Sequence, residues 1–176
     1  YVVALPSVQT AFAATRGEAS VPYTMAMVGF AVGNIILGRL ADRFGILTPI
    51  LISIAALGIG YVGAGFSPTL WLFCAAHFVL GFGSAASFGP LIADLSHWFE
   101  KRRGIAIAIA ATGNYVAGAI WPPVTQYLIS SEGWREAHIA IGIICVVAML
   151  PLSLMFRRGS DPRGSGSADA VPFVAP

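Results

Sequence analysis

Long apolar stretches recur along the whole of this 176-residue chain, and short segments rich in charge separate them. Hydrophobic residues make up 57% of the chain and charged residues only 10%, against about 25% charged residues in an ordinary soluble domain. A helix of about 20 apolar residues is long enough to cross the hydrocarbon core of a bilayer. The sequence therefore predicts an all-α membrane protein with several spans.

Five complete spans and one partial span are expected. The complete spans are predicted at residues 20–38, 47–66, 70–93, 104–128 and 136–156. Residues 1–14 are apolar but short, as though the start of a first helix had been cut away. Residues 159–176 are rich in Gly, Ser and Asp, and such a composition is typical of a flexible linker. We therefore expect a transmembrane unit over residues 1–158, followed by a linker.

The basic residues between the spans predict how the protein is oriented. Two of them fall on one side of the predicted topology, at Arg16 and Arg135. Eight fall on the other side, at Arg39, Arg43, Lys101, Arg102, Arg103, Arg157, Arg158 and Arg163. Because cytoplasmic loops carry an excess of Lys and Arg, residues 38–46, residues 94–104 and the C-terminal tail are expected to be cytoplasmic.

A charged segment closed by glycines, Gly-Arg-Leu-Ala-Asp-Arg-Phe-Gly at residues 38–45, predicts a tight turn between two spans. It resembles the signature G-x-L-A-D-R-x-G of the major facilitator superfamily, which in that family joins the second and third helices on the cytoplasmic side. The resemblance implies the N-terminal six-helix bundle of a major facilitator transporter, with helix 1 truncated and residues 159–176 opening the central loop. The residues that it assigns to a gating motif are Gly38, Asp42, Arg43, Gly45, Asp94 and Arg103.

Two further stretches carry the resemblance. Residues 77–85 match the fourth-helix pattern R-x-x-x-G-x-G-x-A, with His77 in place of the arginine. Residues 98–106 and 133–135 are similar to the W-F-x-x-R-R-G-x-A and G-W-R signatures of the monocarboxylate and oxalate/formate branch. Ile46 stands where the loop motif normally has a basic residue, so Arg43 or Arg103 is expected to pair with Asp94 instead. The proline-glycine motif of drug/proton antiporters is absent from residues 113–121, which disfavours drug efflux.

Polar and aromatic side chains within the spans are candidates for a substrate or proton path. They are His77, Asn34, Asn114, Tyr115 and Trp121. An ionisable residue within a membrane marks a functional site by default, and a histidine can change its charge in the physiological pH range. A hydrogen-bonded packing role is the alternative for His77, and Asn114 could simply join two helices. Gly81, one turn below His77, is expected to leave open space beside it.

Small residues recur at four-residue spacing in three spans, at Gly29 and Gly33, at Gly81, Ala85 and Gly89, and at Ala110, Asn114 and Gly118. Because lipid is as apolar as leucine, helices in a membrane associate through such closely packed surfaces. We expect a neighbouring helix to pack closely against each of the three stripes. In a transporter the same smooth surfaces also allow helices to slide.

The sequence thus predicts a secondary active transporter that moves a small solute by alternating access. An organic anion such as a monocarboxylate is the expected solute, carried with a coupling ion, and a C-terminal half outside this chain would complete the cavity. The protein is expected to be a multi-pass protein of the plasma membrane or bacterial inner membrane. The alternative in another class is a non-transporting assembly or scaffold subunit.

Enzymatic and nucleic-acid-binding functions are not expected. His77, Asp94 and Cys74 are spread along one span, so no catalytic cluster forms at one depth. Cys74 and Cys145 lack the spacing of a disulfide framework or metal site, and no basic face with aromatic platforms is present for nucleic acid. We therefore predict no catalytic, cofactor or metal residues.

Overall fold

The computed structural model describes residues 2–87 and 103–156. The described ranges contain six α-helices and no strand, so the all-α prediction is confirmed. The helices are α1 (Leu5–Ala11), α2 (Arg16–Phe44), α3 (Leu47–Gly65), α4 (Leu70–Ser84), α6 (Arg103–Glu132) and α7 (Trp134–Phe156). Two 3₁₀ turns, η1 (Val2–Ala4) and η2 (Ala85–Ser87), precede α1 and follow α4. By length and composition α2, α3, α6 and α7 are each able to cross a membrane, and α4 is a shorter apolar helix.

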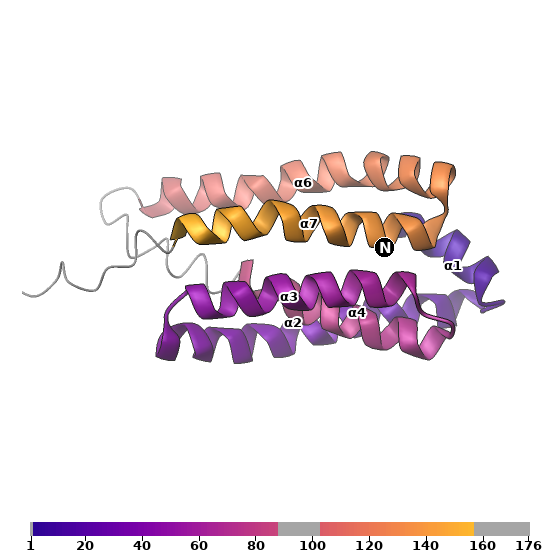
Figure 1. The fold of residues 1–176 in the computed structure, drawn as a ribbon, viewed down its shortest axis with the longest axis horizontal. Coiled ribbons are helices and arrows are strands. Elements are labelled where there is room, and N and C mark those ends of the chain that lie inside the picture. The colour runs from indigo at the N-terminus through magenta and orange to yellow at the C-terminus, as the bar shows by residue number, and fades with distance from the viewer. Residues whose placement is uncertain (1, 88–102, 157–176) are drawn as a thin grey trace, which may run out of the picture.

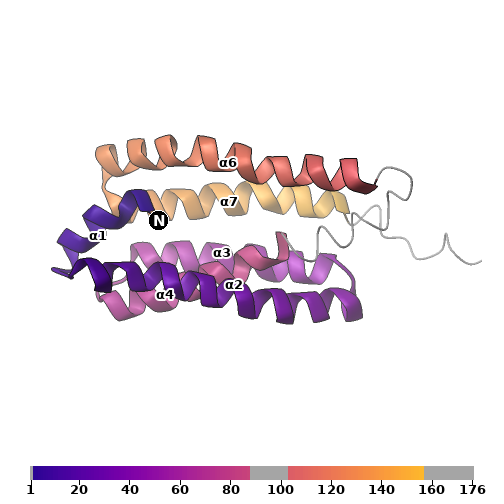
Figure 2. The same cartoon turned by 180° about the vertical axis from the view of Figure 1, so that it is seen from behind.

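The helices lie roughly parallel to a common axis in two layers (Figures 1 and 2). Helices α6 and α7 form one layer, and α2, α3 and α4 form the other. The most extensive interfaces join α2 to α4, α3 to α7 and α3 to α4. Helix α1 lies at the end of the bundle where α6 turns into α7. We call this the α1 end. The turn between α2 and α3 lies at the opposite end.

Helix α2 has a clear start signal and a clear stop signal. At its start the Thr15 hydroxyl accepts a hydrogen bond from the Glu18 backbone N–H, and the Glu18 carboxylate accepts one from the Thr15 backbone N–H. This reciprocal capping box satisfies two otherwise unpaired donors. At its end Gly45 has φ 77°, a backbone conformation that glycine adopts at no steric cost.

The tight turn expected between the two spans is present, but it is shorter than the charged motif at residues 38–45, because α2 ends at Phe44 and α3 begins at Leu47. Residues 38–44 continue α2, and the chain leaves the helix only at Gly45. The Gly45 N–H still donates to the Ala41 carbonyl at 2.9 Å. Arg, Leu and Ala are strong helix formers, so the segment between the two glycines has no local reason to leave the helix.

Helices α2 and α4 approach closely through glycine. A Cβ atom added at Gly29 would overlap the Phe78 carbonyl oxygen, and one added at Gly81 would overlap the Ala26 carbonyl oxygen. One added at Gly33 would lie 2.7 Å from the Phe82 carbonyl oxygen. The close packing predicted for the small-residue stripes of α2 and α4 is therefore confirmed at Gly29, Gly33 and Gly81. The stripe on α6 has no such neighbour in the described part of the chain, since nothing lies within 4 Å of a Cβ at Gly118.

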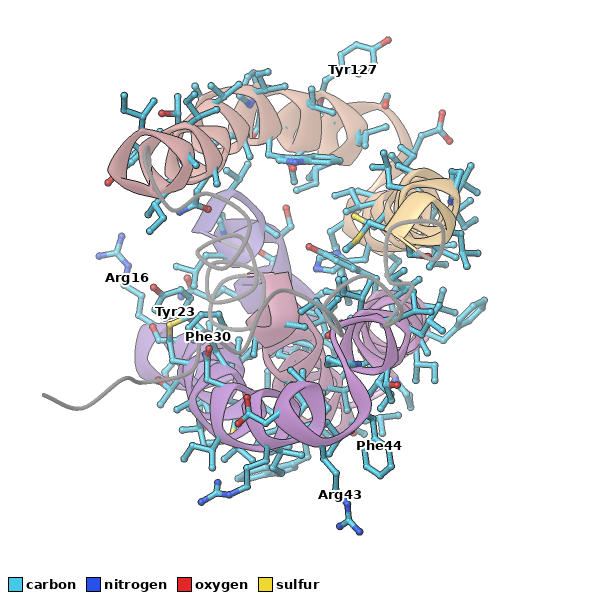
Figure 3. All side chains as sticks on the ribbon, turned by 90° about the vertical axis from the view of Figure 1, so that its left-hand side faces the viewer. Arg16, Tyr23, Phe30, Arg43, Phe44 and Tyr127 are labelled. Atoms are coloured by element: carbon cyan, nitrogen blue, oxygen red, sulfur yellow. The ribbon has the colours of Figure 1, made fainter. Side chains whose placement is uncertain are left out.

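The outer surface of the bundle is largely apolar. Trp71 is 82% exposed and Ile109 is 69% exposed, and no residue of α6 between 104 and 132 is buried. Figure 3 shows Tyr127 of α6 and Phe44 at the end of α2 pointing away from the helices. In water an exposed apolar surface of this size would promote aggregation, whereas in a bilayer it can contact lipid.

Candidate functional site

His77 of α4 is buried near the α1 end, with only 4% of its surface exposed. Its Nδ1 lies 3.0 Å from the backbone carbonyl oxygen of Phe73, one turn earlier. A carbonyl oxygen can only accept, so Nδ1 carries the hydrogen of this bond. In the neutral imidazole Nε2 is then the acceptor nitrogen.

A second histidine, His138 of α7, has the same arrangement. It is 6% exposed, and its Nδ1 donates to the Trp134 carbonyl oxygen at 2.6 Å. The centres of the His77 and His138 rings are 5.9 Å apart, with a 62° angle between their planes. Two imidazoles from helices far apart in the sequence, both presenting Nε2 as acceptor, therefore meet inside the bundle.

Sequence reasoning missed His138, although a signal was present. At a rise of 1.5 Å per residue, His77 lies about 10 Å below the start of α4 and His138 about 6 Å below the start of α7. Both helices begin at the α1 end. A comparison of depths would have placed the two histidines at similar levels, but only the α3–α4 and α3–α7 interfaces bring them together.

Aromatic rings surround the pair and join four parts of the chain. Phe73 of α4 lies 4.3 Å from the His77 ring centre and 5.6 Å from that of His138. Trp134 of α7 is 5.9 Å from His138, and Tyr61 of α3 is 6.3 Å from it. Phe12, which follows α1, contacts Phe73 at 5.8 Å and Trp134 at 5.6 Å. We call these four aromatic side chains, together with the two histidines and Ala76, the histidine–aromatic cluster.

The charges around the pair favour a single proton. Two imidazolium charges 5.9 Å apart would repel each other by about 3 kcal/mol at an effective dielectric constant of about 20. The cation of Arg135 stacks on the Trp134 ring, 4.8 Å from its centre. Electrostatic repulsion therefore disfavours protonation of both histidines at once.

The other residues predicted for a substrate or proton path do not join this cluster. Asn34 of α2 donates from Nδ2 to the carbonyl oxygen of Phe30 in its own helix, at 2.9 Å. Asn114 and Tyr115 are exposed on α6, Tyr115 by 78%, and Trp121 is half-buried on the same helix. Their roles in a path stay predictions.

The space expected beside His77 is filled, which corrects that expectation. Gly81 packs against the backbone of α2, and a methyl group in its place would overlap Ala26. The glycine serves the close approach of two helices and does not open a passage.

The gating motif lies at the end of the bundle opposite the α1 end. Asp42, Arg43 and Gly45 are exposed, and Gly38 is half-buried. The Arg43 guanidinium lies 5.4 Å from the centre of the Phe44 ring, and Arg43 points away from the helices (Figure 3). Asp42 makes no ion pair with any described residue. Asp94 and the Arg103 side chain lie outside the described residues, so pairing at Asp94 stays a prediction.

Candidate metal ligands do not gather in the described ranges, where no three side chains of His, Cys, Asp or Glu converge. Cys74 and Cys145 are both free thiols. The histidine pair is therefore the chemically distinctive feature of the described structure.

Comparison with known proteins agrees with the helical architecture and with the signature residues. Residues 1–175 match the family model of the Major Facilitator Superfamily. The chain belongs to the Major Facilitator Superfamily. Members of this superfamily are integral membrane proteins, which agrees with the four helices that are long and apolar enough to cross a membrane.

The similar superfamily proteins are transporters. The probable sulfoacetate transporter of Cupriavidus necator is 26% identical over 173 residues, which cover 98% of this chain and 40% of that protein. Human monocarboxylate transporter 11 is 31% identical over 131 residues, covering 70% of this chain and 28% of its own length. A riboflavin transporter of Trypanosoma brucei brucei is 33% identical over 87 residues, or 49% of this chain and 16% of its own. This chain thus spans less than half the length of each.

Proposed function

We propose that this chain is the N-terminal half of a secondary active transporter that moves a small organic anion by alternating access. Family membership supports the transporter class. Sulfoacetate and monocarboxylates, named for two of the similar proteins, are small organic anions. Residues 1–158 would form the transmembrane half and residues 159–176 the start of the loop to a C-terminal half, which would complete the cavity.

The environment of His77 is the observation that supports both an anionic solute and its coupling to protons. The imidazole is buried at 4% exposure with its Nδ1 already bonded to the backbone. Burial disfavours a charged group unless an opposite charge lies beside it. Protonation of His77 would be favoured by an anion beside it, so proton and anion would enter together.

The proposed orientation places the α1 end outside the cell. Arg16 and Arg135 lie near the turns at this end, whereas Arg39 and Arg43 lie at the other end of α2. The positive-inside rule then assigns residues 38–46, residues 94–104 and the tail to the cytoplasm. In this orientation the histidine–aromatic cluster lies in the outer half of the membrane. Asp42 lies at the cytoplasmic surface, where it would meet the C-terminal half during gating.

Uptake by the full-length protein in proteoliposomes tests this function. Labelled sulfoacetate and lactate are the anionic probes, and riboflavin is the larger comparison solute. We expect an inward proton gradient to stimulate anion uptake, and His77→Gln to flatten the pH dependence of uptake between about pH 6 and 7, because glutamine does not titrate. A pH profile of His77→Gln that overlays the parent profile would contradict coupling through His77. The scaffold alternative predicts no uptake of any of the three solutes.

A further inference from the structure

Two arginines, Arg39 and Arg43, lie on one face of α2 near the end of the bundle opposite the α1 end. They are four residues apart in the helix, so their side chains are neighbours, and both are exposed. Ile35 and Ile36, about one turn before Arg39, are exposed beside them. We call these four residues the arginine face of α2. It combines two positive charges with an adjoining apolar surface.

The described helices leave the arginine face uncovered. Nothing lies within 4 Å of a Cβ atom added at the neighbouring Gly38, and Ile35 is 59% exposed. Arg43 points away from the helices (Figure 3). The close contacts of α2 with α4 are made elsewhere on the helix, at Gly29 and Gly33. Among the described helices, none therefore separates the arginine face from lipid.

The contacts of the two guanidinium groups leave most of their N–H donors available. Arg39 donates from Nη1 to the Ile35 carbonyl oxygen of its own helix at 3.5 Å, which is long for a hydrogen bond. Arg43 lies over the ring of Phe44, 5.4 Å from the ring centre. Each guanidinium carries five N–H donors. Within the described residues, no carboxylate forms an ion pair with either arginine, although Asp42 lies between them in the sequence.

The depth of Arg39 favours a phosphate group as its partner. At 1.5 Å per residue, Arg39 lies about 8 Å before the end of α2 at Phe44, and its bond to the Ile35 carbonyl directs the guanidinium back along the helix, away from that end. A positive charge just below a membrane surface is costly unless a counter-charge meets it, and lipid headgroups lie within reach of such a side chain. Two arginines and one aspartate give residues 38–45 a net charge of +1.

We propose that the arginine face of α2 is a binding site for an anionic phospholipid, such as phosphatidylglycerol. The lipid phosphate accepts hydrogen bonds from Arg39 and Arg43, because guanidinium groups bind phosphate oxygens through paired N–H donors. One acyl chain lies along Ile35 and Ile36, which extend the site toward the middle of the membrane. The site requires neither a particular solute nor proton coupling, so it is independent of the function proposed above.

Native mass spectrometry of the full-length protein, with graded amounts of phosphatidylglycerol or phosphatidylcholine added in detergent, measures this binding. Phosphatidylcholine is the matched lipid, because it has the same phosphate and acyl chains but no net charge. We expect the parent protein to retain phosphatidylglycerol more tightly than phosphatidylcholine. Equal retention of the two lipids would overturn the proposal.

Substitutions locate the bound lipid. The double variant Arg39→Gln, Arg43→Gln should bind phosphatidylglycerol about 25-fold more weakly, because each arginine beside anionic lipid contributes about fivefold, or about 1 kcal/mol. The control, Arg16→Gln with Arg135→Gln, removes the same charge at the α1 end and should leave the affinity unchanged. An unchanged affinity in the first double variant, or an equal loss in the control, would overturn the proposal.

A variant of opposite sign keeps the test decisive if the double variant does not fold. Asp42→Asn removes a negative charge beside the arginine face, so phosphatidylglycerol should bind more tightly. Unchanged or weaker binding by Asp42→Asn would contradict a lipid phosphate at this position.

Two other partners of the arginines are outcomes of the same experiment. Glycerol phosphate carries the anionic group without acyl chains, and its displacement of phosphatidylglycerol at equal concentration would show a phosphate site and overturn the lipid proposal. Carboxylates from the rest of the full-length protein are the other possibility. In that case Arg39→Gln with Arg43→Gln would lower Tm and leave phosphatidylglycerol retention unchanged, which would also overturn it.

Discussion

Replacing Gly81 by alanine tests whether the contact between α2 and α4 sets the geometry of this bundle. The added methyl group would overlap the Ala26 carbonyl, and because that neighbour is backbone, the two helices must separate to admit it. Overpacking of this kind typically costs about 1–3 kcal/mol, and alanine returns up to about 1 kcal/mol through its higher helix propensity. We expect a net loss of about 1–2 kcal/mol in the free energy of unfolding.

Thermal unfolding of the full-length protein, followed by size-exclusion chromatography in detergent, measures this loss. A fall of a few degrees in Tm is expected for Gly81→Ala. The matched control is Gly17→Ala in the first turn of α2, where no atom lies within 4 Å of the added methyl group. Its Tm should stay the same or rise.

A double variant sharpens the test. A methyl group at Gly29 would overlap the Phe78 carbonyl across the same interface. Once the helices have separated for the first methyl group, the second should cost less. The loss of unfolding free energy in the double variant should therefore be smaller than the sum of the two single losses, by at least about 0.5 kcal/mol. Equal Tm values for Gly81→Ala and Gly17→Ala, or strict additivity of Gly29→Ala and Gly81→Ala, would refute the reasoning.

Three further predictions concern the gating motif, the topology and a turn. Asp42→Asn should lower transport by the full-length protein at unchanged membrane abundance, because Asp42 is exposed and even an ion pair at such a position would contribute only about 0–1 kcal/mol to stability. Equal transport by the variant and the parent would mean that the segment serves only to set the topology. A single cysteine introduced as Arg102→Cys should not react with an impermeant thiol reagent added outside intact cells. Ready labelling of this cysteine would contradict the proposed orientation. Ala13→Gly should raise Tm slightly, since Ala13 has φ 47° and a left-handed non-glycine residue costs roughly 1–2 kcal/mol; a lower Tm would show that this turn is not strained.

The class of the protein could be predicted from the sequence because the deciding signals are local. Apolar runs of span length and scarce charge predict membrane helices whatever their neighbours are. The signature residues around Asp42 and in the stretch from His77 to Ala85 indicated the superfamily, which the family match confirms. The capping box at Thr15 and the glycine at Gly45 act within one helical turn, so the limits of α2 were also within reach of the sequence. The length of the turn at residues 38–45 was nonetheless overestimated, because charge was given more weight than helix propensity.

The neighbours of each side chain were decided only by the tertiary structure. His77 and His138 lie 61 positions apart in the chain, and no local pattern pairs them; they meet because α3 packs against both α4 and α7. The space beside Gly81 was wrongly predicted to be open, because the sequence alone does not show which helix packs against a glycine. Contacts between helices depend on how whole apolar surfaces fit together. For that reason the membrane helices could be predicted from the sequence, while the contact between His77 and His138 emerged only from the packing of their helices.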